Sequence, residues 1–369
     1  MESIVDETTA ECSCSSGCCG SAPIPNAPYI AGLNETLVGA VPRVSTELSL
    51  RDILGAWQVR WGFGRMSYKV VPGLYSVGKP AENSPVLVTA NYKLTFDSLR
   101  KELAGLSLWI LVLDTNGVNV WCAAGKGTFG TDELVRRIEA AGLEKVIKHR
   151  TLILPQLGAT GVAAYEVAKK SGFHVRYGPV RAHDIKAFLD NEMKVTPEMR
   201  EVRFTMRNRA VLTPVDLIRW VKPLAIFFGI LFILNTFGLG NFGWTELVAF
   251  FGAVVTGCVL TPVLLPWIPG RAFAFKGALL GLIWTVVVLL LCGGLPQLGI
   301  IRTLSFILLL PAVSAYTAMN FTGSSTYTSP SGVNKEMRVA IPAMLVSSIL
   351  GIILLVVSLV VSGLVETIL

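Results

Sequence analysis

Charged residues are scarce in this chain. Asp, Glu, Lys and Arg make up 15% of its 369 residues, against about 25% in an ordinary soluble domain, and hydrophobic residues make up 52%. This balance excludes a plain soluble globular protein. It also excludes a disordered chain, because disorder requires low hydrophobicity. The formal net charge is +7, but the basic residues form no single dense cluster. We therefore expect no nucleic-acid partner, and we expect the excess of positive charge to set the membrane topology.

Charge is almost missing from five apolar runs in the second half of the chain. Each run is near the ~20 residues that a membrane-spanning helix needs. The runs are Val221–Phe237, Thr245–Leu264, Phe275–Leu291, Ile301–Met319 and Ala340–Val361. We predict an all-α transmembrane domain with five helices over residues 221–369, preceded by a linker over 207–220.

The few charges around these runs predict their orientation. The short loops 238–244 and 292–300 carry no charge, whereas Lys and Arg stand on the other side, at Arg219, Lys222, Arg271, Lys276, Lys335 and Arg338. Positive residues favour the cytoplasm. We expect a multi-pass protein of the cell (inner) membrane, with a cytoplasmic N-terminal half and its C-terminus outside. Arg302 is the one basic residue that does not fit this orientation. The acidic N-terminus lacks the apolar stretch of a signal peptide.

Ionisable side chains are also scarce inside the runs. Glu246 and Arg302 lie only near the ends, where a long side chain reaches water at little cost. Transporters and proton pumps usually carry charged groups within the membrane. We therefore expect the helices to serve as an anchor and a docking surface, and a conducting role is the alternative.

The first half alternates short apolar strands with helices. Expected strands are Pro85–Thr89, Leu106–Asp114, Thr151–Leu154 and Phe173–Tyr177, and expected helices are Phe96–Leu103, Thr131–Ala141, Val162–Lys170 and Ala182–Asn191. This order predicts an α/β domain over residues 46–206 with a Rossmann-like, mostly parallel sheet and helices on both faces. Ligands of such sheets bind at the carboxyl ends of the strands. The loops to inspect are therefore 89–95, 115–130, 155–161 and 178–181.

The loop over 115–130 is rich in small residues and holds one cysteine, Cys122. A phosphate-binding P-loop is excluded, because Val120 stands where that motif needs its first glycine. Gly125, Gly127 and Gly130 have the spacing of a dinucleotide fingerprint, but they come well after the strand and match it weakly. A cysteine at a helix N-terminus is biased toward the thiolate. Cys122 is then a candidate nucleophile, metal ligand or redox centre, and a buried structural cysteine is the alternative.

Residues 119–126 read Asn-Val-Trp-Cys-Ala-Ala-Gly-Lys. This segment resembles the signature of the mercury-methylating corrinoid protein family (HgcA), and segments 84–97, 154–164 and 177–182 resemble further cofactor loops of such domains. The resemblance covers the whole chain. It implies a corrinoid-binding domain similar to that of the corrinoid iron–sulfur protein, followed by a five-helix membrane domain. Residues 119–126 would form a short cap helix over the corrinoid.

The resemblance also implies the cofactor and its contacts. A corrinoid of the cobalamin (B12) type is held base-off, with the Cys122 thiolate as axial cobalt ligand and catalytic residue. Its implied lining residues are Thr89, Asn91, Asn119, Trp121, Ala123, Gly125, Lys126, Gly127, Thr128, Phe129, Leu157, Gly158, Gly178, Pro179 and Val180. Asn119 is in addition a candidate helix cap. Trp121 and Phe129 pack either on the corrin or on the sheet, and Lys126 contacts either a corrin amide or solvent.

Histidine is scarce, which agrees with a thiolate ligand. Many B12 proteins present a histidine to cobalt from an Asp-x-His-x-x-Gly motif, and none of His149, His174 and His183 stands in that context. A donating axial sulfur raises electron density on the metal, as it does in haem proteins. A methyl group on the opposite side then takes carbanion character, which suits a soft electrophile such as Hg(II).

Four further cysteines lie in a flexible tail over residues 1–45 that is rich in Ser, Gly and Pro. They are Cys12, Cys14, Cys18 and Cys19. Their spacing matches neither the ferredoxin run nor the paired cysteines of zinc ribbons. Because thiols favour soft metals, the tail is a candidate arm for Hg(II) capture, and a poorly ordered tail is the alternative.

The function implied by the resemblance is corrinoid-dependent methyl transfer. A methyltetrahydrofolate-linked donor supplies the methyl group, and the protein passes it from methyl-Co(III) to Hg(II), giving methylmercury. The return to Co(I) needs a low-potential electron, so the implied partner is a small ferredoxin-like protein with two 4Fe–4S clusters (HgcB). Two alternatives stay open. One is a corrinoid methyl carrier for another acceptor, and the other is a non-catalytic membrane receptor or transporter with an α/β sensor domain.

Overall fold

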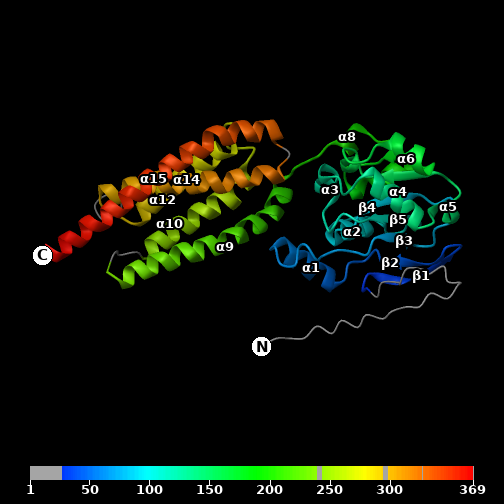
Figure 1. The fold of residues 1–369 in the computed structure, drawn as a ribbon, viewed down its shortest axis with the longest axis horizontal. Helices are drawn as coiled ribbons and strands as arrows, with labels where there is room; N and C mark the ends of the chain where they lie inside the picture. Colours follow the sequence, from blue (N-terminus) through cyan, green and yellow to red (C-terminus); the bar gives the residue numbers. More distant parts are fainter. Residues whose placement is uncertain (1–26, 239–242, 294–297, 326, 369) are drawn as a thin grey trace, which may run out of the picture. The chain divides into compact units, whose positions relative to one another are not determined.

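The computed structural model describes residues 27–238, 243–293, 298–325 and 327–368. They form two compact units (Figure 1). The first, the sheet unit, comprises Tyr68–Met199 and the described residues before Leu50. The second, the helical unit, comprises Leu50–Ser67 and the chain from Arg200 onward. The segment Leu50–Ser67 therefore groups with the helices, although the sequence places it in the α/β domain.

The described strands of the sheet unit form one mixed sheet in the order β1-β2-β3-β5-β4-β6-β7. The strands are β1 (Ile30–Thr36), β2 (Gly39–Val44), β3 (Gly73–Val77), β4 (Val86–Ala90), β5 (Leu108–Leu113), β6 (Thr151–Leu154) and β7 (His174–Tyr177). β5, β4, β6 and β7 run parallel to one another. β3 is antiparallel to β5 and parallel to β2, and β1 is antiparallel to β2. The expected parallel sheet is thus present, and β3, β2 and β1 extend it on one side with strands of mixed direction.

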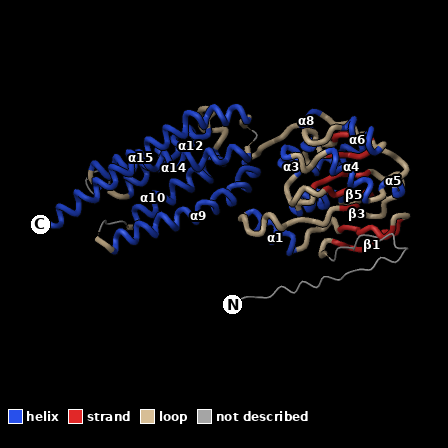
Figure 2. Tube along the Cα trace, in the orientation of Figure 1, coloured by secondary structure: helices blue, strands red, loops and turns tan. Residues whose placement is uncertain are grey.

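Helices cover both faces of this sheet, as predicted (Figure 2). β5 shows why, because its residues are all buried and alternate between two apolar cores. Trp109, Leu111 and Leu113 join the core under α4 and α6, and the intervening residues join the core under α2 and α7. The helices are α2 (Lys93–Arg100), α3 (Val120–Lys126), α4 (Thr131–Ala140), α5 (Leu143–Val146), α6 (Ala164–Ser171), α7 (Ile185–Asp190) and α8 (Pro197–Arg200).

The first two strands correct the assignment of residues 1–45 to one tail. β1 and β2 pair antiparallel from Ile30 and Val44 to the Thr36–Gly39 turn. The Asn34 amide donates a hydrogen bond to Ser76 Oγ on β3 at 3.0 Å, which ties the hairpin to the sheet. Residues of β1 alternate only between half-buried and exposed, so no apolar run marks the strand in the sequence.

A buried ion-pair network fixes α2 to the chain that follows β2. Arg100 is fully buried and donates from Nε to Asp97 Oδ1 at 2.8 Å. Its Nη1 donates to the carbonyls of Ser45 and Glu47 at 2.6 and 2.7 Å. Lys93 Nζ lies 2.6 Å from the other oxygen of Asp97. Each charge in the network has a partner, which a buried charge requires.

The helical unit contains five helices long and apolar enough to cross a membrane among the described residues. They are α9 (Met206–Thr236), α10 with its continuation (Trp244–Leu264), α12 (Phe273–Leu291), α14 (Ile300–Asn320) and α15 (Pro330–Ile368). The continuation of α10 consists of a π-helical stretch, Thr256–Leu260, and α11 (Thr261–Leu264). All five predicted runs coincide with these helices. The predicted linker over 207–220 does not, because it forms the first turns of α9.

Small residues let α12 and α14 approach closely. A Cβ added at Gly277 would lie 2.6 Å from the Ala318 side chain, and one at Gly281 would lie 2.7 Å from the Ser314 side chain. Ser314 Oγ donates to the Gly277 carbonyl at 2.8 Å. Such small-xxx-small spacing is typical of helices that associate in membranes.

Arg302 and Glu246, the two charged residues near the ends of the runs, form an ion pair. Glu246 is 1% exposed and also accepts a hydrogen bond from the backbone N–H of Gly243, at the start of α10. The sequence analysis expected both side chains to reach water separately. The ion pair with Glu246 instead neutralises Arg302, the basic residue that does not fit the predicted orientation, within the protein.

Candidate functional site

The candidate site lies where β4, β5, β6 and β7 end. Because these strands are parallel, their carboxyl ends share one edge of the sheet, and the loops that follow them meet there. Each of the four loops chosen from the sequence follows one of these strands. Most of the predicted lining residues come from the loop after β5 and from α3.

Asn91, directly after β4, is the centre of a buried hydrogen-bond network. Its Oδ1 accepts from the Thr115 N–H at 3.1 Å, the Thr115 hydroxyl at 2.9 Å and the Gly117 N–H at 3.0 Å. Its Nδ2 donates to Asp114 Oδ1 at 3.0 Å. The side chain is 1% exposed, so it organises the loop after β5. A backbone contact from Asn91 to a cofactor stays a prediction.

The same loop is held from the other side by Glu133 in the first turn of α4. Glu133 Oε1 accepts from the Asp114 N–H at 2.8 Å. Burial raises the pKa of Glu133, but the Asp114 N–H and the guanidinium groups of Arg136 and Arg137 outweigh this effect, so the pKa lies below its ordinary value. The sequence analysis missed Asp114, Thr115 and Glu133 as site-forming residues. Asp114 and Thr115 could have been recognised in the sequence, because they are two polar residues directly after a buried strand.

A tight turn then directs the chain into α3. Asn116 and Gly117 both have left-handed backbone conformations, with φ of +54° and +73°. Asn119 caps the helix as predicted, since its side chain accepts from the Cys122 N–H at 2.9 Å. Gly127 ends the helix with φ of +81°.

The short helix α3 places Cys122 at the border between the core and the surface. Trp121 is 43% exposed and Cys122 is half-buried, whereas Ala123 and Ala124 are buried in the core. Gly125, Lys126 and Gly127 are exposed, and Thr128 is half-buried. A ligand approaching this face can therefore reach the Cys122 side chain.

Phe129 is fully buried and packs on the sheet, which decides between its two predicted positions. A Cβ added at Gly158 would lie 2.6 Å from the Phe129 ring, and one at Gly161 would clash with the Phe129 carbonyl. The two glycines thus allow the loop after β6 to pack against α3. Gly158 has a packing role that the sequence did not reveal.

The other predicted residues divide by burial. Thr89 lies inside β4 and is buried, as are Gly178 and Pro179 after β7. Leu157 and Val180 are half-buried, each in the loop after its strand. The Tyr177 hydroxyl donates to the Val162 carbonyl at 2.6 Å, and burial raises the pKa of Tyr177. The buried residues form the floor of the site, and the half-buried ones contribute to its surface.

Cys122 belongs to no cluster of protein ligands. Within the part of the chain that the structure describes, no three His, Cys, Asp or Glu side chains come together to hold a metal ion. His149 bonds the Ser84 carbonyl at 2.9 Å, and His183 lies 3.2 Å from Asp184.

Two of the remaining cysteines belong to the helical unit. Cys258 is buried there, and Cys292 Sγ lies 3.9 Å from Thr245 Oγ1. The four tail cysteines, Cys12, Cys14, Cys18 and Cys19, lie outside the described residues.

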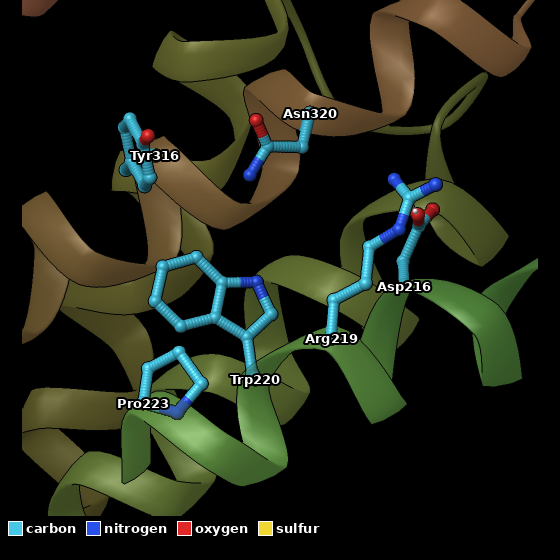
Figure 3. Close-up of a pocket in the computed structure, with 6 residues that line it drawn as sticks. All are labelled: Asp216, Arg219, Trp220, Pro223, Tyr316 and Asn320. Carbon is cyan, nitrogen blue, oxygen red and sulfur yellow. Dashed lines mark hydrogen bonds and ion pairs between the residues drawn. The ribbon is translucent and has the colours of Figure 1, made fainter. Parts of the chain in front are cut away.

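The helical unit has a separate hollow between α9 and α14 (Figure 3). Asp216, which is 6% exposed, pairs with Arg219 at 3.4 Å. The rings of Trp220 and Tyr316 meet edge to face at 5.8 Å. Hydropathy could not reveal this hollow, because its residues come from two runs far apart in the chain.

Comparison with known proteins relates the sheet unit to one enzyme complex. The family model of the CO dehydrogenase/acetyl-CoA synthase delta subunit matches residues 62–189. The gamma subunit of the acetyl-CoA decarbonylase/synthase complex of Methanopyrus kandleri is 35% identical over 130 residues, which are 35% of this chain and 28% of that subunit. The corresponding subunit of Methanocaldococcus jannaschii is 32% identical over 140 residues, 37% of this chain and 28% of the subunit. The chain thus matches about 28% of the length of these relatives.

These matches correct the interpretation drawn from residues 119–126. The chain was expected to resemble the mercury-methylating corrinoid protein family, and that assignment is wrong. The matching family model and relatives are subunits of acetyl-CoA decarbonylase/synthase and CO dehydrogenase/acetyl-CoA synthase. A motif of eight residues describes one helix, whereas the match over 62–189 spans most of the sheet and its loops.

Proposed function

We propose that this protein is a corrinoid-dependent methyl carrier with its corrinoid at the carboxyl edge of the sheet. The observation that carries the proposal is the set of side chains that could ligate a metal at this site. One half-buried thiol, Cys122, lies between exposed and buried residues of α3, and among the described residues it belongs to no group of three or more metal-binding side chains. This arrangement suits a metal whose equatorial ligands come from its own macrocycle. The relatives support a role in one-carbon chemistry, because they are subunits of CO dehydrogenase/acetyl-CoA synthase and acetyl-CoA decarbonylase/synthase.

The surface around Cys122 fits a broad, flat group. A Cβ added at Gly125 or Gly127 would meet no atom within 4 Å, so the space beside both residues is open. Trp121 is exposed on the same helix and offers an aromatic face. Thr128, Leu157 and Val180 are half-buried and would complete the contact surface, over the buried Thr89, Asn91, Ala123, Gly158, Gly178 and Pro179. Lys126 is exposed and would reach either the rim of the group or solvent.

When bound, the corrinoid supplies a methyl group that can be transferred. Cys122 would ligate its cobalt as a thiolate, with the corrinoid held base-off. The Asn119 cap holds the backbone of Cys122 and thereby limits the directions its sulfur can take. A thiolate donates strongly, as axial cysteine does in haem proteins, and so favours release of the methyl group with its electron pair.

We propose Hg(II) as the methyl acceptor on this ground. A methyl group with carbanion character suits a soft, electron-poor metal ion, and the product would be methylmercury. The methyl donor would be linked to methyltetrahydrofolate, and an iron–sulfur protein with two 4Fe–4S clusters would return the cobalt to its low-valent state. The relatives favour a second candidate, methyl delivery to an acceptor of acetyl-CoA synthesis.

The helical unit would anchor this carrier in the cell membrane. Five helices have the required length and apolarity. The loops with Lys and Arg would face the cytoplasm together with the sheet unit. The Glu246–Arg302 pair removes the one charge that opposed this topology.

Methyl loss from the loaded protein tests the proposal. The full chain is loaded with methylcobalamin, and methyl loss is followed with Hg(II), with a thiol, or with no acceptor. We expect rapid loss only to Hg(II) in the wild type and in Cys292→Ala, and slow loss in Cys122→Ala. Transfer to the thiol alone would favour the second candidate. Equal rates in wild type and Cys122→Ala would contradict the role of the thiolate.

A further inference from the structure

The helix α1 (Leu50–Arg60) and the turns that follow it expose an unusual apolar surface. α1 turns Asp52 and Val59 inward, where they are 5% and 2% exposed. Its other side presents large apolar side chains to the outside. They are Leu50, Ile53, Leu54, Trp57 and Trp61, followed by Phe63 and Met66 in the turns, and their exposed fractions run from 38% to 78%. We call these seven residues the α1 surface.

The spacing of the α1 surface places its helical residues in one stripe. Positions 50, 53, 54 and 57 recur every three or four residues, which places them on one side of α1, and Trp61 follows in the turn directly after the helix. Monomeric soluble proteins rarely leave so many large apolar side chains exposed together. Two of the seven are tryptophans, which are enriched where a protein meets the headgroup level of a membrane.

The end of this segment lies against the part of α9 that precedes the first apolar run. A Cβ added at Gly62 would lie 3.8 Å from Ile218 Cγ2. Ile218 stands three residues before Val221, where the run begins, and three residues of helix advance by about 4.5 Å. The helix α1 itself also contacts α9. The α1 surface therefore joins the helical unit at the level where α9 would pass from water into the membrane.

The charges beside the α1 surface match an anionic membrane. Arg51 and Arg65 are exposed at its two ends, and the acidic residue of α1, Asp52, is buried. Phospholipid headgroups of the cytoplasmic leaflet carry negative charge and attract such basic residues. An apolar stripe flanked by arginines is the composition of a helix that lies in the interface.

We propose that Leu50–Met66 is an interfacial anchor whose α1 surface inserts into the anionic, cytoplasmic headgroup region of the bilayer. The proposal goes beyond methyl transfer and rests only on the membrane insertion of the helical unit. The anchor would hold the chain between β2 and β3 on the membrane surface, beside the start of the first apolar run.

Quenching by brominated lipids tests the anchor in the full chain. The protein is placed in nanodiscs of phosphatidylcholine and phosphatidylglycerol with bromine near the headgroup or deep in the acyl chain. Emission of the wild type is compared with that of Trp57→Phe/Trp61→Phe, and the difference reports these two rings. A Trp121→Phe variant in the sheet unit serves as the matched control.

We expect the Trp57 and Trp61 emission to be quenched strongly by shallow bromine and weakly by deep bromine. The Trp121 emission should be quenched by neither. The anchor is refuted if neither shallow nor deep bromine quenches the emission of Trp57 and Trp61 while the remaining tryptophans of the helical unit are quenched. That result would mean that protein covers the α1 surface. If no tryptophan is quenched, the helical unit itself is not inserted, and the proposed membrane location fails together with the anchor.

A charge variant adds a second measurement. Trp57→Glu places an acidic group in the α1 surface, and Gln58→Glu places it at the neighbouring exposed position. Backbone hydrogen exchange over Leu50–Arg60 should rise in Trp57→Glu nanodiscs and stay near the wild type in Gln58→Glu. Equal exchange in the two variants would contradict insertion of this side of the helix.

Discussion

The side chain of Asn119 accepts a hydrogen bond from the backbone N–H of Cys122 at 2.9 Å. This one contact both begins α3 and fixes the backbone of the proposed cobalt ligand. The cysteine is thus held by a cap three residues away in the same segment, and its direction does not depend on a larger cluster of side chains. The stability of α3 and the position of the thiol are therefore linked.

Replacing Asn119 by Ala should weaken both the stability of α3 and the positioning of the Cys122 thiol. Loss of an N-cap costs about 1 kcal/mol of helix stability, which is a large share for a helix of seven residues. We expect Asn119→Ala to retain less corrinoid and to show a smaller sulfur-ligated fraction. The measurement is the optical spectrum of the loaded full chain. Asn119→Asp keeps an acceptor at the cap and should behave as the wild type, and equal losses in both variants would contradict the capping role.

Replacing Asn91 should unfold the loop after β5. Asn91→Leu leaves the Thr115 and Gly117 N–H groups without their acceptor, and a buried unsatisfied group costs roughly 1–3 kcal/mol. We expect the free energy of unfolding of the sheet unit to fall by several kcal/mol, measured by denaturant titration. Thr89→Val, which alters a buried polar residue of β4 just before Asn91, should cost less. A larger effect of Thr89→Val would show that Asn91 is not the centre of the network.

Glu133 should make this loop sensitive to acid. Because its pKa in the folded protein is lowered, its contribution to stability is present above the pKa of the unfolded chain, near 4.5. That contribution is lost as the pH falls through the folded value. We expect Glu133→Gln to lower the stability at neutral pH and to flatten the acid limb of the profile below about pH 5. An acid limb as steep in Glu133→Gln as in the wild type would contradict this account.

The packing of α12 against α14 depends on the absence of a side chain at Gly281. Gly281→Leu places a side chain against Ser314 and Pro311, and overpacking of this kind costs about 1–3 kcal/mol. We expect a lower midpoint of thermal unfolding in detergent micelles. Gly229→Leu on α9 is the control, because a Cβ there meets no atom within 4 Å. An equal shift in the two variants would point to helix propensity as the cause.

The sequence predicted the central strands well because burial on both sides leaves an uninterrupted apolar run. Leu108–Leu113 is the clearest case, and the five apolar helices follow from the same principle. β1 and β2 escaped prediction, since β1 alternates only between half-buried and exposed residues and β2 buries only Val41 and Val44. The hydrogen bond from Asn34 to Ser76 that ties this hairpin to β3 joins residues far apart in the chain, and no local pattern reports it.

At the candidate site, the sequence predicted Cys122 and its cap from residues within one helix. It left the position of Phe129 open and did not reveal the buried network of Asn91, whereas the structure places these side chains in the core and in that network. Both side chains act through residues from another loop, so their roles depend on the tertiary fold. The family assignment failed for a related reason, because a short motif carries information about one helix only.

The spectrum of the full chain loaded with cobalamin tests the central claim most directly. Wild type, Cys122→Ala and the control Cys292→Ala are compared by optical and EPR spectroscopy. We predict a base-off, sulfur-ligated signature in the wild type and in Cys292→Ala, and its loss in Cys122→Ala. The same spectrum in all three proteins, or no retained corrinoid in any of them, would contradict the account.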